Sequence, residues 1–171
     1  DLSGNAGSGN AASTRVDTAA PSVVVTITDE LLSQGETSPV SFSFSEKVDG
    51  FTLDDVSVVG GALSGLSSSD GGQTWSATFT PGTDFTGTAS ITVQDGSYTD
   101  LSGNAGRGNT ASTSVDTAAP GVVVAITDAQ LSQGETSPVT FSFSEKVDGF
   151  TLDDVSVVGG TLSGLSSSDG G

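Results

Sequence analysis

The 171-residue sequence contains no cysteine and no histidine. Without cysteine there is neither a disulfide framework nor a thiolate nucleophile, and without histidine the usual zinc sites and Ser-His-Asp triads are excluded. No apolar run approaches the roughly 20 residues that a membrane-spanning helix requires. The N-terminus also lacks the basic start and apolar stretch of a signal peptide, as expected of a sequence that begins inside a longer protein. These absences argue against an enzyme and against a membrane span.

Positive charge is scarce, with four Lys and Arg against 21 Asp and Glu and a formal net charge of -17. Such a chain is repelled by nucleic acid and by anionic membrane surfaces, so cations are its natural partners. A compact fold with this much like charge also repels itself, and divalent ions among the carboxylates relieve that repulsion. Metal binding is therefore the leading chemical hypothesis.

The residues that are abundant indicate an all-β fold. Glycine numbers 24, the hydrophobic content is 33%, and Val, Thr and Phe dominate the apolar runs, which is typical of short strands around thin sandwich cores. In residues 39–45 and 74–80, apolar and polar residues alternate, which predicts strands with one buried face and makes Trp75 a core residue. Seven strands are predicted, at about 22–28, 39–45, 55–59, 62–67, 74–80, 88–94 and 109–116.

The sequence repeats itself with an offset of 99 residues. Residues 1–72 align with residues 100–171 without a gap, and nine positions differ: Ser8/Arg107, Ala11/Thr110, Arg15/Ser114, Ser22/Gly121, Thr26/Ala125, Glu30/Ala129, Leu31/Gln130, Ser41/Thr140 and Ala62/Thr161. A period near 100 is too long for a solenoid turn and matches an independently folding sandwich domain. The sequence therefore predicts tandem immunoglobulin-like β-sandwich repeats.

The joint between repeats falls in the motif VDTAAP, where Pro21 and Pro120 stiffen an extended linker. On this phasing residues 18–116 form one complete repeat, 1–17 the end of a preceding repeat and 117–171 the first half of a following one. The last segment has no counterpart of residues 73–115, so its sheet edges and core are expected to be open. We expect that neighbouring chains complete these halves or that the sequence ends do not coincide with domain ends.

The predicted strand order gathers acidic residues at one pole of the domain. If successive strands alternate in direction, every second loop lies at the same end. The loops at the leading end then carry Asp17, Glu46, Asp54, Asp55, Asp100 and Asn104. Ca²⁺ takes six to eight hard oxygen ligands from such groups, whereas Mg²⁺ prefers fewer protein ligands and keeps its water. The sequence thus predicts Ca²⁺ binding, with adjacent repeats as partners.

The candidate ligands are the acidic residues of this pole, the following linker and the second copy. They are Asp17, Glu46, Asp54, Asp55, Asp100, Asn104, Asp116, Glu145, Asp153 and Asp154. For Asn104, the alternation in DLSGNAG is similar to that of an EF-hand loop, but a glycine-rich turn explains it equally. For Asp54 and Asp55 the alternative is a solvated loop that caps a strand. Asp70 and Asp169 precede glycine and are interpreted as turn residues.

Four segments carry a family resemblance: VDTAAP, FSFSEKVDGFTLDDVSVVGG, LSSSDGGQTWSATFTP and YTDLSGNAG. Together they resemble the bacterial Ig-like repeats of giant biofilm-associated and repeats-in-toxin adhesins. The resemblance implies a secreted or cell-surface spacer in which Ca²⁺ near domain junctions stiffens the run. By position it implies Asp17, Glu46, Asp54, Asp100 and Asp116 as ligands. The sequence contains no GGxGxD nonapeptide repeat.

Two other classes of protein are alternatives to the spacer. A lectin-like module requires an exposed aromatic platform, but Trp75 is interpreted as buried and Tyr98 is the single tyrosine. A self-assembling filament or surface-layer subunit would use the open strand edges of the incomplete halves to exchange strands between chains. That alternative overlaps with the spacer, because both add length.

Overall fold

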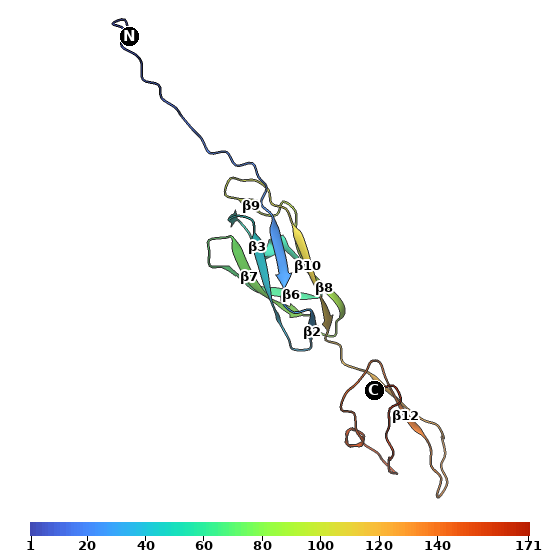
Figure 1. Cartoon of the computed structure of the whole chain (residues 1–171). Coiled ribbons are helices and arrows are strands. Elements are labelled where there is room, and N and C mark those ends of the chain that lie inside the picture. Colours follow the sequence, from blue (N-terminus) through green and yellow to red (C-terminus); the bar gives the residue numbers. More distant parts are fainter. The chain divides into compact units, whose positions relative to one another are not determined.

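The structure is a computed structural model that describes all residues from Asp1 to Gly171 (Figure 1). The chain divides into two compact units, Asp1–Thr117 and Ala118–Gly171, here called unit 1 and unit 2. Residues 1–20, which precede the first strand of unit 1, form no regular structure and are exposed. The complete sandwich therefore lies in residues 21–117.

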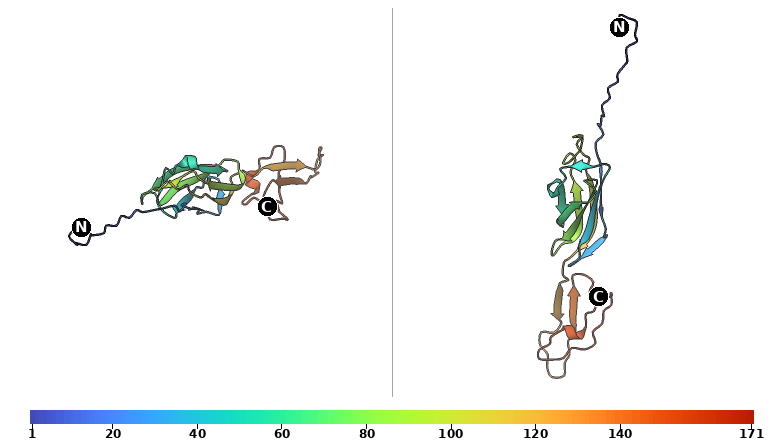
Figure 2. Two further views of the ribbon diagram at one scale, coloured as in Figure 1. Left: turned by 90° about the horizontal axis from the view of Figure 1, so that it is seen from above. Right: turned by 90° about the vertical axis from the view of Figure 1, so that its left-hand side faces the viewer.

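Unit 1 consists of two four-stranded sheets that pack face to face (Figure 2). The first sheet has the order β1 (Val23–Ile27), β3 (Ser38–Phe44), β7 (Thr74–Pro81), β6 (Gly61–Ser68). The second has the order β2 (Leu31–Ser33), β10 (Asn109–Asp116), β8 (Thr86–Val93), β5 (Val56–Val59). A two-stranded pair, β4 (Val48–Asp49) and β9 (Thr99–Asp100), and the 3-10 turn η1 (Leu53–Asp55) lie outside them. This arrangement confirms the all-β immunoglobulin-like sandwich.

All seven predicted strands are present, with ends within two residues of the prediction. The prediction omitted β2, β4 and β9, which are two or three residues long, too short to show a period-two pattern. Strand β2 pairs in parallel with β10, so the chain passes from the first sheet to the second directly after β1. These short strands are decided by tertiary pairing.

The core lies between the sheets and is rich in aromatic residues. Phe42 and Phe79 are fully buried, and Trp75 is half-buried against the same cluster, in agreement with its predicted place in the core. The Phe51 ring lies edge-on to its neighbours, with centroids 5.3 Å from Phe42 and 5.5 Å from Trp75. Edge-to-face pairs of this kind contribute about 0.5–1.5 kcal/mol beyond the area they bury.

Tyr98 connects this core to the segment that precedes β1. Its ring packs edge-on against Phe44 at 4.8 Å, and its hydroxyl donates to the carbonyls of Arg107 (2.8 Å) and Pro21 (3.3 Å). Burial, followed by the nearby Asp95 carboxylate, raises the pKa of Tyr98 to about 12. Because Tyr98 is 2% exposed, it provides no platform for a sugar ring, and it stays a neutral hydrogen-bond donor.

Unit 2 repeats the first part of unit 1 without the strands that cover it. Strands β11 (Val122–Ile126) and β12 (Val139–Phe143) pair in the register of β1 and β3, and the turn η2 (Leu152–Asp154) follows. Val122 and Val124 are 50% and 54% exposed, whereas their counterparts Val23 and Val25 are 4% and 6% exposed. The same hairpin forms in both units, but only unit 1 contains β7, β8 and β10 to bury its inner face.

The matched phenylalanines Phe42 and Phe141 test this difference. Phe42→Ala is expected to cost about 3–5 kcal/mol of unfolding free energy, because it empties a fully buried site. Phe141→Ala changes a half-buried ring in unit 2 and should leave the unfolding of unit 1 unaltered. Trp75, the single tryptophan, reports on unit 1 by its fluorescence during urea unfolding. Equal effects of both variants on the Trp75 transition would contradict the separation into two units.

Candidate metal centre

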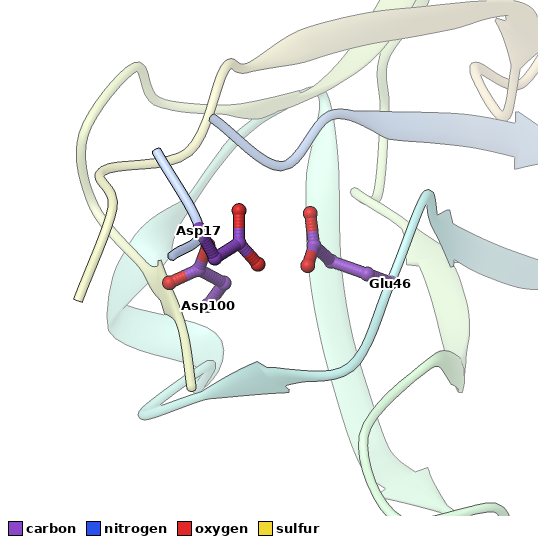
Figure 3. A group of neighbouring side chains, drawn as sticks. All are labelled: Asp17, Glu46 and Asp100. Atoms are coloured by element: carbon purple, nitrogen blue, oxygen red, sulfur yellow. The ribbon is translucent and has the colours of Figure 1, made fainter. Parts of the chain in front are cut away.

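Three carboxylates from separate parts of unit 1 meet at one end of the sandwich (Figure 3). Asp17 lies in the segment before β1, Glu46 in the turn between β3 and β4, and Asp100 in β9. One oxygen from each lies within 4.8 Å of the others. Strand β9 pairs with β4 so that Val48 faces Asp100, and this pairing brings the two loops together. All three residues were predicted as ligands from the sequence.

Asp100 is held by its own loop. Its Oδ1 accepts hydrogen bonds from the backbone N–H groups of Ser102 and Asn104, each 2.8 Å, and its Oδ2 accepts from Asn104 Nδ2 at 2.7 Å. Gly103, at φ +86°, closes the turn in a backbone conformation that favours glycine. Burial alone would raise the pKa of Asp100, but the hydrogen bonds from Asn104 and Ser102 outweigh it, and the pKa is lowered. Asp100 is therefore a fixed, ionised carboxylate.

The same loop occurs at the N-terminus without a domain around it. Asp1 accepts hydrogen bonds from the N–H groups of Ser3 and Asn5 and from Asn5 Nδ2, at 2.8–3.0 Å. Residues 1–5 are exposed, so the five residues DLSGN form this turn from local interactions alone. Hydrogen bonds within the turn thus account for the alternation of Asp, Ser and Asn in DLSGN. In the second copy of the turn, the side chain of Asn104 donates to Asp100 and orients its carboxylate.

Glu46 faces two other negative charges. Partial burial, followed by repulsion from Asp17 and then from Asp100, raises its pKa above the ordinary value. No hydrogen bond within the protein reaches its carboxylate, whereas Asp17 Oδ1 accepts one from Ala19 N–H at 3.1 Å. Glu46 and Asp17 therefore keep most of their lone pairs for another partner.

The spacing of the three carboxylates suits a divalent cation with hard oxygen ligands. Ca²⁺–oxygen distances average about 2.4 Å, so two oxygens bound to one ion lie at most about 4.8 Å apart. The three oxygens meet this limit. Asp100 already accepts three hydrogen bonds and has room for one further interaction, while Glu46 and Asp17 offer more. The group could supply three ligands, leaving further positions to carbonyls or water.

The other predicted ligands lie outside this cluster. Asn104 borders it, because its Nδ2 also lies 3.3 Å from the Asp17 carbonyl. Asp55 caps the turn η1 by accepting from Thr52 N–H (2.7 Å) and Oγ1 (3.1 Å), and Asp54 beside it is exposed. In unit 2, Asp154 accepts the same two bonds from Thr151, and Asp153 is exposed.

The remaining two candidates are the repeat counterparts of Asp17 and Glu46. Asp116 ends β10, where its Oδ1 accepts from Thr86 Oγ1 at 2.9 Å. Glu145 is exposed in unit 2. The three carboxylates that the structure brings together are those of unit 1, Asp17, Glu46 and Asp100.

Asp70 is a turn residue, as the sequence indicated. Its Oδ1 accepts from Thr74 N–H (2.9 Å), Gln73 N–H (3.0 Å) and Ser68 Oγ (2.9 Å), and so organises the loop between β6 and β7. These bonds, above all that from Thr74, lower its pKa far below the ordinary value of 3.8. The structural role of Tyr98 was not predicted from the sequence, although Tyr98 is the single tyrosine and stands just before the DLSGN turn.

The two-sheet topology and buried aromatic core define an immunoglobulin-like β-sandwich module. The chain belongs to the bacterial Ig-like domain family, whose sequence model matches residues 17–115 and 116–171. Domains of this family are typically non-catalytic and often extracellular or surface-exposed. A search of curated proteins found no match to the sequence. The structure contains no helix long and apolar enough to cross a membrane.

The lowered pKa of Asp70 predicts a specific pH dependence. A carboxylate with a depressed folded-state pKa stabilises the fold above its unfolded value, near 3.8, and this contribution disappears as the pH falls through the folded-state value. Asp70→Asn should therefore lower the melting temperature of unit 1 at pH 7, and the difference from the wild type should shrink as the pH falls below 3.8. The readout is Trp75 fluorescence.

Asp169→Asn is the matched control, because this counterpart in unit 2 accepts a hydrogen bond from Ser167 Oγ but none from a following backbone N–H. It should leave the Trp75 transition unchanged. A deficit of Asp70→Asn that is the same at pH 7 and pH 3 would show that its charge is not the source of the effect.

Proposed function

We propose that the chain is part of the non-catalytic extender region of a large secreted or cell-surface bacterial adhesin. In this proposal Ca²⁺ binds Asp17, Glu46 and Asp100 and stiffens the array near domain junctions. The family assignment and the two copies of one domain sequence fit an extender role. The observation that carries the calcium part is the meeting of three carboxylates from three segments. Adhesion and biofilm formation are the processes such a spacer would serve.

The position of Asp17 gives the ion its mechanical role. Asp17 belongs to the extended segment that leads into the sandwich, whereas Glu46 and Asp100 belong to loops of the sandwich itself. A shared cation would tie that segment to the domain. Without the cation, partial burial and then repulsion from Asp17 raise the pKa of Glu46. Ion binding would thus convert a repulsive contact into an attractive one.

The repetition of one domain sequence suits a protein whose role is to provide length. Each repeat of 99 residues presents nearly the same surface, so additional copies add length rather than new chemistry. With strands at about 3.3 Å per residue plus loops, one sandwich spans on the order of 40 Å. Reach would therefore grow with copy number, and rigidity would depend on extracellular calcium.

Calcium is expected to stabilise unit 1. A ligand that binds only the folded state at about 100 times its Kd adds about 2.7 kcal/mol. Millimolar Ca²⁺ should raise the Trp75-monitored melting temperature of the wild type but not that of Glu46→Gln. In the absence of calcium at pH 7, Glu46→Gln should melt above the wild type, because it removes an unfavourable charge. Glu145→Gln, the exposed counterpart in unit 2, should behave as the wild type.

Trypsin reports on the segment itself, because Arg15 lies two residues before Asp17. Calcium should slow cleavage after Arg15 while leaving cleavage after Lys146, in unit 2, unchanged. If calcium alters neither melting nor cleavage, the calcium part of the proposal fails and a spacer stiffened by its proline-containing linkers remains.

A filament built by strand exchange is the second candidate, because unit 2 exposes an apolar face that unit 1 buries. Residues 10–17 differ from β10 at two positions, Ala11/Thr110 and Arg15/Ser114, and are exposed, so they could add to another chain. Strand exchange predicts oligomers at micromolar concentration in analytical ultracentrifugation that disappear when residues 1–17 are removed. A monomer with and without these residues would exclude it.

A further inference from the structure

The chain enters unit 1 at one end of the sandwich and leaves it at the other. Ser22, directly before β1, forms a parallel bridge with Arg107, shortly before β10. Strands β1 and β10 then run in the same direction beside each other, and β10 ends at Asp116, where the chain leaves the domain (Figure 1). A pull on the two ends of unit 1 therefore acts along these strands and draws β1 and β10 in opposite directions.

At the entrance, hydrogen bonds fasten the start of β1 to the start of β10. Arg107 N–H donates to the Pro21 carbonyl at 2.8 Å, and Val25 N–H donates to Asn109 Oδ1 at 3.3 Å. The Tyr98 hydroxyl donates to the Pro21 carbonyl as well. These bonds join the two segments that such a pull would slide past each other.

At the exit, the second sheet joins β2 to β10. The two strands pair in parallel over the three residues of β2. Ser114 N–H donates to the Glu30 carbonyl at 3.1 Å, and Thr113 Oγ1 donates to the Asp29 carbonyl at 2.6 Å. The Thr113 side chain is only 5% exposed, so water has little access to its hydrogen bond. Because β2 follows β1 in the chain, these bonds hold the entering segment against the strand that leaves the domain.

The direction of a load decides how hydrogen bonds between strands share it. When two paired strands are pulled along their length in opposite directions, all the bonds between them bear the load together. When the strands are pulled apart from one end, the bonds break one after another. Each bond contributes little net stability by itself, so breaking several together requires a much larger force. Strand β8 offers the second geometry, because it pairs antiparallel with β10 and places Thr86, at its start, opposite Asp116.

We propose that the hydrogen bonds of residues 21–33 to residues 107–116 form a shear clamp that lets unit 1 bear tension applied through its two ends. This inference rests on the proposed extender role, because a spacer between a cell and its target is stretched through its ends. The clamp needs no cation, so it is independent of the calcium part of that proposal. Forced unfolding follows the barrier to unfolding rather than the equilibrium stability, so the clamp is measured as a rupture force.

The test pulls the full chain in optical tweezers, in EDTA, from two pairs of attachment points. Because the chain has no cysteine, introduced cysteines define these points. Ala20→Cys with Ala119→Cys loads the clamp in shear, whereas Thr83→Cys with Ala119→Cys unzips β10 from β8; all three positions are exposed. Unit 1 should rupture at a several-fold higher force in the first direction. Both attachments leave unit 2 outside the loaded segment.

A pair of variants tests the clamp bonds themselves. Thr113→Val removes the hydrogen bond to Asp29 and should lower the rupture force in the shear direction. Ser68→Ala removes hydrogen bonds in the loop between β6 and β7, outside the clamp, and should leave that force unchanged. Circular dichroism melting verifies that both variants fold and gives the loss of equilibrium stability in each.

Equal rupture forces in the two directions would overturn the proposal, and so would a shear force that Thr113→Val does not lower. Either result would leave the effects of calcium on melting and on trypsin cleavage as they are, because the pulls are made in EDTA. A chain that calcium does not stabilise would in turn leave the difference between the two directions intact. The failure of the clamp and the failure of the calcium site are therefore distinguishable.

Discussion

The packing of Tyr98 against Phe44 and Phe51 is the contact on which the rest of unit 1 depends. The Tyr98 hydroxyl donates to the Pro21 carbonyl and so holds the segment before β1 against the domain. Asp100 lies two residues after Tyr98 in the sequence. Gly106 lies against the ring so closely that an added Cβ would meet its atoms at 2.2 Å. One buried side chain thereby positions both the segment that carries Asp17 and the loop that carries Asp100. Together with the β4–β9 pairing, this contact holds the carboxylate cluster at one end of the sandwich.

The position of the acidic residues in unit 1 follows from its fold as a thin two-sheet sandwich. The inner faces of both sheets are apolar and their outward side chains are uncharged apart from Asp116, so most of the acidic residues lie in loops and short turns. Partial burial, and after it the like charges of Asp17 and Asp100, raise the pKa of Glu46, and this group of carboxylates is where we propose that a cation binds. The proposed metal centre is thus a result of this segregation of charge.

Much of this organisation is readable from residue patterns. The alternation around Phe42 and Trp75 predicted the strands, the 99-residue offset predicted the domain size, and Asp70 before Gly71 predicted a turn. Strand direction placed Asp17, Glu46 and Asp100 at one end of the domain together with other acidic residues, such as Asp54 and Asp55, but it did not single out the three that meet. Local patterns did not reveal β2, β4 and β9, which exist through pairing between distant segments.

The two units separate what is local from what is tertiary. By itself the sequence determined the hairpin, the η turn and the DLSGN loop, because each forms in the same way whether or not a complete domain surrounds it. These structures depend on neighbouring backbone groups, turn glycines and nearest-strand pairing. Tertiary structure alone decided the burial of Val23 against the exposure of Val122, and the approach of Asp17 to Glu46 and Asp100. Both require segments that lie far apart in the sequence: packing of the second sheet onto the first buries Val23, and the pairing of β4 with β9 brings the loops of Glu46 and Asp100 together.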